Sequence, residues 1–196
     1  MKLKLILGSI REGRKTVHVA HHIYQLLAAN TDVEVELIDL REWNLPQFAS
    51  RWGKEEKPDT SLVVVAGKLA EADGLIFISP EYHGSYTGVL KNAIDHYWKE
   101  FKKKPIGVVA TGAGSLGGIN ATTEMQQLVL SLGAFPMPQK LIVPYVQHAF
   151  EEDGTPNNEK YVAQAEQFVS EYIWFAQAIT EAHKRDVTES QTKIQA

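Results

Sequence analysis

The sequence predicts a doubly wound α/β fold, in which a five-stranded parallel sheet of order 2-1-3-4-5 carries helices on both faces. The first observation behind this prediction is that short apolar segments alternate with amphipathic helical segments along most of the 196 residues. The second is that one strand segment, residues 33–39, alternates apolar and charged residues, whereas central parallel strands are continuously apolar. We therefore place this strand at an edge of the sheet, which favours the order 2-1-3-4-5.

The elements of the first half follow from their patterns in turn. An apolar strand over residues 3–7 precedes a helix over 16–29, whose apolar positions recur at helical spacing. We expect its inward face to carry Val19, Ala20, Ile23, Tyr24 and Leu27. After the edge strand, Pro46, Gly53 and Pro58 mark a loop over 41–60. A helix capped by Ser61 then runs to Asp73, and a short apolar run over 75–79 is the third strand.

The second half repeats the same alternation. Apolar residues at helical spacing from Val89 to Phe101 predict a helix, and the apolar run 105–111 predicts the fourth strand. A further helix carries an apolar stripe from Ile119 to Leu132, and residues 141–143 form a short fifth strand. The last helix is expected over 157–179. We expect residues 1–180 to form one domain, and the polar residues 181–196 to form a frayed or disordered tail.

Composition excludes several classes of function. Hydrophobic residues make up 44% and charged residues 22% of the chain, as in ordinary soluble domains, and the net charge of −4 favours neither nucleic acid nor anionic membranes. The absence of cysteine excludes disulfides, thiolate metal sites and thiol nucleophiles. The apolar part of the N-terminus is too short for a signal peptide, and no segment approaches the roughly 18 apolar residues of a membrane span. We therefore expect a cytoplasmic location.

The loop after the first strand has the properties of an anion site. Residues 8–16 read Gly-Ser-Ile-Arg-Glu-Gly-Arg-Lys-Thr, and they lead into the N-terminus of a helix. Free backbone amides at a helix N-terminus attract phosphate, and hydroxyls and cations in the loop add to this attraction. The candidate phosphate-binding residues are Ser9, Arg11, Arg14, Lys15, Thr16 and Val17. An ordinary turn with solvated charges is the alternative. The nucleoside-triphosphatase loop fits poorly, because Arg14 displaces Lys15 and Thr16 by one position.

Two further loops follow neighbouring strands at the same edge of the predicted sheet. The first runs over residues 79–88 and offers exposed amides and a tyrosine, which suit a flat aromatic ligand; its candidates are Pro80, Glu81, Tyr82, His83 and Gly84. The second is rich in glycine, so its backbone can approach a planar ligand closely; its candidates are Thr111, Gly112, Ala113 and Gly114. Packing at a loop base or a solvated imidazole would explain the individual residues of the first loop, and a tight turn would explain the second.

Other chemistry-bearing residues favour simpler explanations. His18, His21 and His22 share one side of the first helix, but no carboxylate or cysteine accompanies them, so we expect a partly solvated face and no metal site. The lysines at 102–104 complement a helix C-terminus. Ser115 lacks the second flanking glycine of an esterase nucleophile turn. We assign no catalytic acid, base or nucleophile.

Taken together, the three loops resemble those of the NADPH-dependent FMN reductase family, flavodoxin-like enzymes that include quinone, azo and chromate reductases. The resemblance extends from residue 3 to about residue 180. The most specific part is the middle loop, where Pro80-Glu81-Tyr82 is followed by Gly88, Leu90 and the run Lys91 to Asp95. The first loop matches at Gly8, Ser9, Arg11, Arg14 and Thr16, and the third ends in the family's glycine pair. Two departures are His83, where the family usually has Asn, and Arg14, where Ser is more common.

The resemblance implies an oxidoreductase that binds FMN and uses NADPH or NADH to reduce a small oxidant such as a quinone, a free flavin or an azo dye. In such enzymes the flavin carries the chemistry and the protein supplies placement and electrostatics. A homodimer or homotetramer is also implied, and four aromatic residues would suit a subunit interface: Trp43, Phe48, Trp52 and Trp98. A flavodoxin-like electron carrier is the alternative, but such carriers have a Ser/Thr-x-Thr-Gly-x-Thr loop and strong negative charge. A non-catalytic scaffold is a third possibility.

Overall fold

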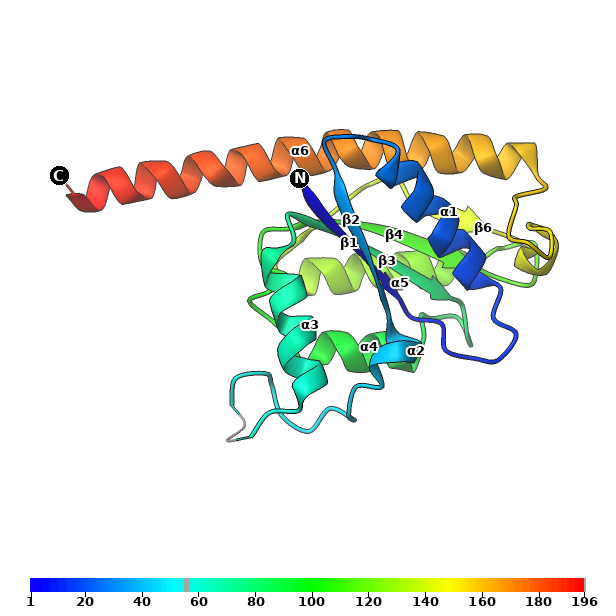
Figure 1. The fold of residues 1–196 in the computed structure, drawn as a ribbon, viewed down its shortest axis with the longest axis horizontal. Coiled ribbons are helices and arrows are strands. Elements are labelled where there is room, and N and C mark those ends of the chain that lie inside the picture. Colours follow the sequence, from blue (N-terminus) through cyan, green and yellow to red (C-terminus); the bar gives the residue numbers. More distant parts are fainter. Residues whose placement is uncertain (55–56, 196) are drawn as a thin grey trace.

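The computed structural model describes residues 1–54 and 57–195, and it has the predicted alternation of strands and helices (Figure 1). All strands of the sheet run parallel. The elements in chain order are β1 (Lys2–Leu7), α1 (Thr16–Ala28), β2 (Glu34–Asp39), α2 (Leu40–Trp43), α3 (Thr60–Glu71), β3 (Gly74–Pro80), α4 (Gly88–Asp95), β4 (Pro105–Thr111), α5 (Ile119–Ser131), β5 (Phe135–Pro136), β6 (Leu141–Val143), the 3-10 turn η1 (Val146–His148) and α6 (Glu159–Gln195).

The strand order β2-β1-β3-β4-β5 confirms the predicted order, with β2 at the edge. The fifth position differs, because two short strands share it and the sheet has six strands. β5 pairs with the start of β4, where Ile106 faces Pro136, and β6 pairs with its end, where Val109 faces Leu141. Prolines at 136 and 138 cannot donate to the ladder, and this accounts for the interruption between the two strands.

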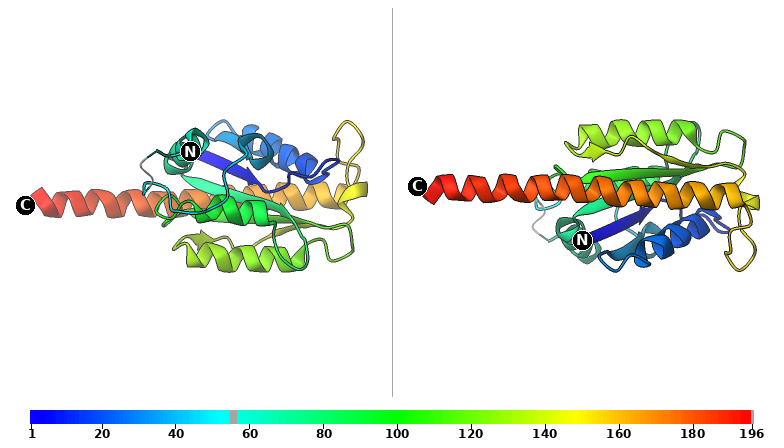
Figure 2. Two further views of the ribbon diagram at one scale, coloured as in Figure 1. Left: turned by 90° about the horizontal axis from the view of Figure 1, so that it is seen from below. Right: turned by 90° about the horizontal axis from the view of Figure 1, so that it is seen from above.

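Helices cover both faces of the sheet, as predicted. Figure 1 shows α1 and α6 on one side and α3, α4 and α5 on the other, and the turned views of Figure 2 show the same layers. Each side has its own core. One is built around Phe77 and Phe101, and the other around Phe168 and Tyr172, all fully buried. Two layers of helix on a continuous parallel sheet hide its apolar residues from water, which is the main stabilising contribution of this architecture.

Several local predictions need correction. A short helix, α2, interrupts the predicted loop at residues 40–43, because the Asp39 side chain accepts a hydrogen bond from the Arg41 amide and caps it. The cap of α3 is Asp59 and not Ser61: the Asp59 carboxylate accepts from the Ser61 amide at 2.8 Å. Tyr24 was expected to face inward, yet it is 37% exposed, since it lies at the margin of the buried side of α1.

The last helix is longer than predicted. α6 begins at Glu159 and continues through residue 179 to Gln195, across the predicted boundary of the tail; Ala196 lies outside the described residues. Residues 180–195 contain no proline or glycine, so nothing in the local sequence stops the helix, although it projects past the sheet (Figures 1 and 2). An ion pair of 3.0 Å between Lys103 Nζ and Asp186 Oδ2 links it to the body. Within the described residues, no helix combines the length and apolar character needed to cross a membrane.

Candidate functional site

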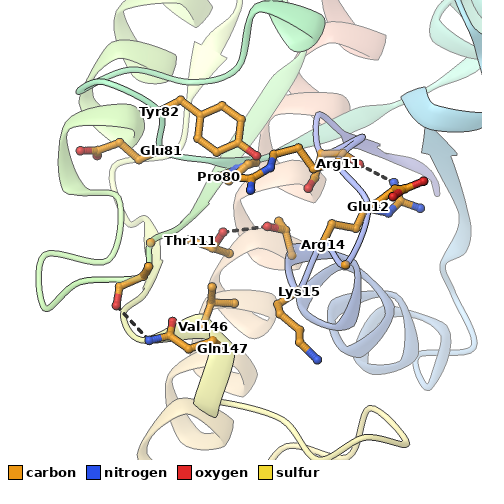
Figure 3. A pocket seen from close by; sticks show the side chains of 15 residues that line it. Arg11, Glu12, Arg14, Lys15, Pro80, Glu81, Tyr82, Thr111, Val146 and Gln147 are labelled. Atoms are coloured by element: carbon orange, nitrogen blue, oxygen red, sulfur yellow. Dashed lines mark hydrogen bonds between the residues drawn. The ribbon is translucent and has the colours of Figure 1, made fainter.

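The loops predicted to form a site converge on a cavity at the carboxyl edge of the sheet (Figure 3). The cavity has a volume of about 350 Å³, within the roughly 300–1,000 Å³ of ligand pockets. After β1 the chain crosses to one face of the sheet, and after β3 and β4 it crosses to the other face. The cavity lies between these departing segments, which is the usual ligand position in doubly wound sheets. Its lining residues are Ser9, Arg11, Glu12, Gly13, Arg14, Lys15, Thr16, Pro80, Glu81, Tyr82, Thr111, Gly112, Ala113, Val146 and Gln147.

Two cations of the first loop remain available to a ligand. Arg11 and Lys15 are exposed at the cavity, and within the described residues neither forms an ion pair. The Arg11 guanidinium lies 5.7 Å from the centre of the Tyr82 ring, so its side chain reaches across the cavity from the first loop to the second (Figure 3). The arrangement favours an anion between the loops.

The N-terminus of α1 also faces this cavity. The residue before the helix is Lys15, which makes no side-chain cap, and the first turn holds no acidic residue. The partial positive charge of the helix end is therefore uncompensated by the protein. At the same place, the hydroxyls of Thr16 and Thr111 lie 2.8 Å apart and buried, which fastens the start of α1 to the end of β4. Val17 does not line the cavity.

Arg14 has a different environment from the other two cations. Its guanidinium donates to both carboxylate oxygens of Asp39 and to the Ser9 carbonyl, with 2.6 Å between Nη1 and Oδ1. The side chains of Arg14 and Asp39 are only 11% and 7% exposed. Arg14 thus lines the cavity, but its charge is already paired inside the protein.

The second loop brings Pro80, Glu81 and Tyr82 to the cavity and leaves His83 and Gly84 outside it. Tyr82 and Ser85 exchange backbone hydrogen bonds of 2.9 and 3.1 Å around His83 and Gly84. Both central residues have positive φ, of 52° and 81°, as a tight hairpin turn requires. His83 is therefore the exposed tip of a turn, in a left-handed conformation that Asn and His tolerate better than most residues.

The sequence predicts exposed backbone amides in this loop, but the two amides nearest the cavity are engaged within the protein. The Glu81 amide donates to the Thr111 carbonyl, and the Tyr82 amide donates to Ser85. The Glu81 carboxylate accepts from the Ala121 amide at 3.0 Å and from the Asn120 side chain at 3.2 Å, so it caps α5 and points away from the cavity (Figure 3). What the loop presents to a ligand is the ring of Tyr82.

The third loop supplies a wall almost free of side chains. Thr111, Gly112 and Ala113 line the cavity, whereas Gly114 does not. A Cβ on Gly112 would approach the backbone of Gly117 to 3.0 Å, so the fold of the loop itself disfavours a side chain there. The Ala113 amide donates to no protein atom within the described residues and remains available to a ligand.

Four lining residues were missed by the sequence analysis. Glu12 and Gly13 lie between predicted residues, and Val146 and Gln147 come from the segment after β6. The Val146 amide donates to the Gly112 carbonyl at 3.1 Å, and Gln147 Nε2 donates to the Ala113 carbonyl at 3.2 Å (Figure 3). The rule that placed the other loops at this edge also applies to the segment after the last strand, so the signal was present.

The other residues considered in the sequence lie outside the lining of this cavity. The rings of His18 and His22 pack against Phe150, and their centres lie 5.7 Å and 6.4 Å, respectively, from the centre of the Phe150 ring. His21 is exposed. Within residues 1–54 and 57–195, no group of three or more metal-ligating side chains was found. The Lys104 ammonium donates to the carbonyls of Leu69 and Ala70, and thus caps the C-terminus of α3.

Comparison with known proteins identifies the family. A sequence model described as NADPH-dependent FMN reductase matches residues 1–148. The chain belongs to this family. The FMN-dependent NADPH-azoreductase of Staphylococcus saprophyticus is 32% identical to this FMN reductase over 183 residues, which are 89% of this chain and 95% of the relative. The enzyme of the same name from Staphylococcus aureus is 31% identical over an equal length and equal shares of both chains.

Solved structures show the same fold for this FMN reductase. FerB, a flavoenzyme NAD(P)H:(acceptor) oxidoreductase from Paracoccus denitrificans, superimposes with a TM-score of 0.75 at 24% identity and covers 90% of this chain and 97% of its own. Flavodoxin 2 from Bacillus cereus reaches 0.60 at 19% identity, with 88% and 98% covered. At such identities the likeness shows the flavodoxin-like fold, as predicted, and nothing about activity.

Family membership confirms the predicted enzyme class, an oxidoreductase with FMN as its cofactor and NAD(P)H as its electron donor. The cavity of this FMN reductase suits that cofactor. Unpaired cations and the uncapped end of α1 can receive a phosphate, and a glycine-rich wall opposite a tyrosine can receive a planar ring.

Proposed function

We propose that this protein is an FMN-dependent reductase that uses NADPH or NADH to reduce quinones, free flavins, azo compounds or similar small oxidants. The observation that carries the proposal is the convergence of three strand-end loops, each with a different chemistry, on one cavity. When bound, FMN supplies the hydride transfer between nicotinamide and oxidant. The protein then needs only to hold the cofactor and to tune the charge around it.

The phosphate would be held by the first loop. Arg11 and Lys15 provide two positive charges against a phosphate group of about −1.5 to −2. The start of α1 adds its free amides, and Ser9, buried and lining the cavity, adds a hydroxyl. Charge-assisted hydrogen bonds of this kind are about twice as strong as neutral ones.

The ring would lie between the second and third loops. Tyr82 offers an aromatic surface, and Gly112 and Ala113 let the backbone come close on the other side. The Ala113 N–H can donate to a ring edge that gains negative charge on reduction, which favours the reduced state. We assign no general acid or base to any residue.

Sequence similarity favours an enzyme over an electron carrier. Flavodoxin 2 shares the fold, but the relatives with higher sequence identity are named as NADPH-dependent enzymes. The name of these relatives also motivates azo compounds as acceptors. Ala113, on the wall proposed for the ring, is exposed, so a second planar molecule can approach the ring from solvent.

We further propose that the protein forms a homodimer or homotetramer and acts in the cytoplasm, where reduced nicotinamide is regenerated. Two of the four aromatic residues expected at an interface are well exposed, Phe48 at 40% and Trp98 at 49%. Trp43 and Trp52 instead pack partly buried against the core, so the interface would centre on Phe48 and Trp98.

The test starts from the visible absorbance spectrum of the purified protein, before and after addition of FMN. We expect stoichiometric binding of FMN, followed by oxidation of NADPH or NADH in the presence of a quinone or an azo dye. A protein that binds no FMN would disprove the assigned site. A protein that binds FMN but oxidises neither nicotinamide would favour the electron carrier.

A further inference from the structure

The first loop is fastened to the edge strand by a buried ion pair. Arg14 donates to both oxygens of Asp39, the last residue of β2, and the same guanidinium holds the Ser9 carbonyl. Asp39 also accepts from the Arg41 amide, so the carboxylate joins three segments: the first loop, the end of β2 and the start of α2. These contacts leave the Arg14 guanidinium directed at protein groups.

Stability alone is a poor explanation for such a pair. Removing two charges from water costs several kcal/mol, and well-packed apolar residues often replace a buried pair without loss. A bidentate pair does, however, fix the geometry of what it joins. Because the peptide unit is planar and trans, holding the Ser9 carbonyl on Arg14 also sets the direction of the Ile10 N–H. The pair therefore determines how the first loop presents its backbone at the cavity.

We propose that Arg14 is a positioning residue for the cofactor and not a ligand of its phosphate. The Arg14–Asp39 pair would hold the loop in the shape that receives the phosphate on Ser9, Arg11, Lys15 and the start of α1. This inference rests on the proposed FMN site. It adds a role for Asp39, which lies outside the cavity lining and is 25 residues away from Arg14 in the chain.

The two possible roles of Arg14 predict opposite effects of changing its partner. If Arg14 binds the phosphate, Asp39→Asn releases the guanidinium, and FMN binding tightens or stays the same. If Arg14 positions the loop, Asp39→Asn and Arg14→Gln break the same contact. Both variants then weaken FMN binding, and the double variant binds no more weakly than either single one.

The experiment is calorimetric titration of the parent, Arg14→Gln, Asp39→Asn and the double variant with FMN and with riboflavin, which lacks the phosphate. We expect each variant to bind FMN about tenfold more weakly, the double variant to match the singles, and riboflavin affinity to change less than threefold. General destabilisation would weaken both ligands equally. Lys103→Gln, which breaks the exposed pair with Asp186, is the control and should change neither affinity.

Three results would overturn the inference: unchanged or tighter FMN binding by Asp39→Asn, fully additive losses, or equal losses for riboflavin. Circular dichroism checks that each variant is folded. Should Asp39→Asn fail to fold, Arg14→Lys decides the question, since a lysine keeps the charge but cannot hold Asp39 and Ser9 together. We expect it to bind FMN almost as weakly as Arg14→Gln, and parent-like affinity would contradict positioning. A parent that binds neither ligand would instead refute the proposed function.

Discussion

Arg11→Ala gives the most direct test of the phosphate site. Arg11 is exposed, belongs to the loop between β1 and α1, and forms no ion pair within the described residues. Its removal therefore leaves no buried charge behind and should not affect folding. Any loss of FMN affinity can then be attributed to the missing contact with the ligand.

The size of the loss follows from what Arg11 does with and without ligand. A hydrogen bond to a charged group contributes about 1.5–3 kcal/mol. In the free protein the guanidinium lies 5.7 Å from the Tyr82 ring centre. To bind the phosphate, Arg11 must give up this exposed cation–π contact, which costs about 0.5–1 kcal/mol. The difference, about 0.5–2.5 kcal/mol, corresponds to a roughly 2- to 70-fold rise in the Kd for FMN.

The assay is quenching of FMN fluorescence on titration with protein, with riboflavin as the phosphate-free comparison. Riboflavin affinity should stay within a factor of about two, because it offers Arg11 no charged partner. Lys99→Ala is a suitable control, since Lys99 is exposed and lies outside the cavity lining. Lys104 is unsuitable, because it caps α3. If Arg11→Ala binds FMN as tightly as the parent, the phosphate does not lie at this loop.

Three further predictions follow from the same geometry. Glu12→Gln removes a negative charge from the cavity rim and should tighten FMN binding a few-fold at low salt and less at high salt; titrations at two salt concentrations check this, and weaker binding would contradict it. His83→Val should lower stability by roughly 1–2 kcal/mol because φ is 52°, whereas His83→Asn should not; urea unfolding distinguishes them, and equal stabilities would refute the strain argument. Burial lowers the pKa of His22 below 6.5, so the unfolded chain binds protons first and stability falls as the pH drops below about 6.5. His22→Leu should flatten that decline in unfolding experiments from pH 7 to 5, and an unchanged slope would show that other groups cause it.

Much of the fold was predictable because it depends on local patterns. The alternating segment 33–39 identified the edge strand, and the other apolar runs identified the inner strands. The split of the last position between β5 and β6 was not predicted, since it depends on which residues of β4 each segment reaches. The end of α6 differs from the prediction, because a polar composition indicates disorder even where helix formers without glycine or proline continue a helix.

The location of the cavity was also predictable, because parallel strands bring their following loops to one edge whatever the loops contain. The composition of those loops indicated an anion and a planar ring, and the resemblance to FMN reductases named the ligand. Val146 and Gln147 were not predicted, although the segment after the last strand is a fourth loop at the same edge.

The roles of individual side chains required the tertiary structure. Arg11, Arg14 and Lys15 are equivalent cations in the sequence, yet Asp39, 25 residues from Arg14, pairs only Arg14. Thr16 was a phosphate candidate, but its hydroxyl meets Thr111, 95 residues away. Element type and strand order depend on the spacing of apolar residues, which can be read along the chain. The charge left for a ligand depends on contacts between distant residues, and those exist only once the sheet has brought its loops together.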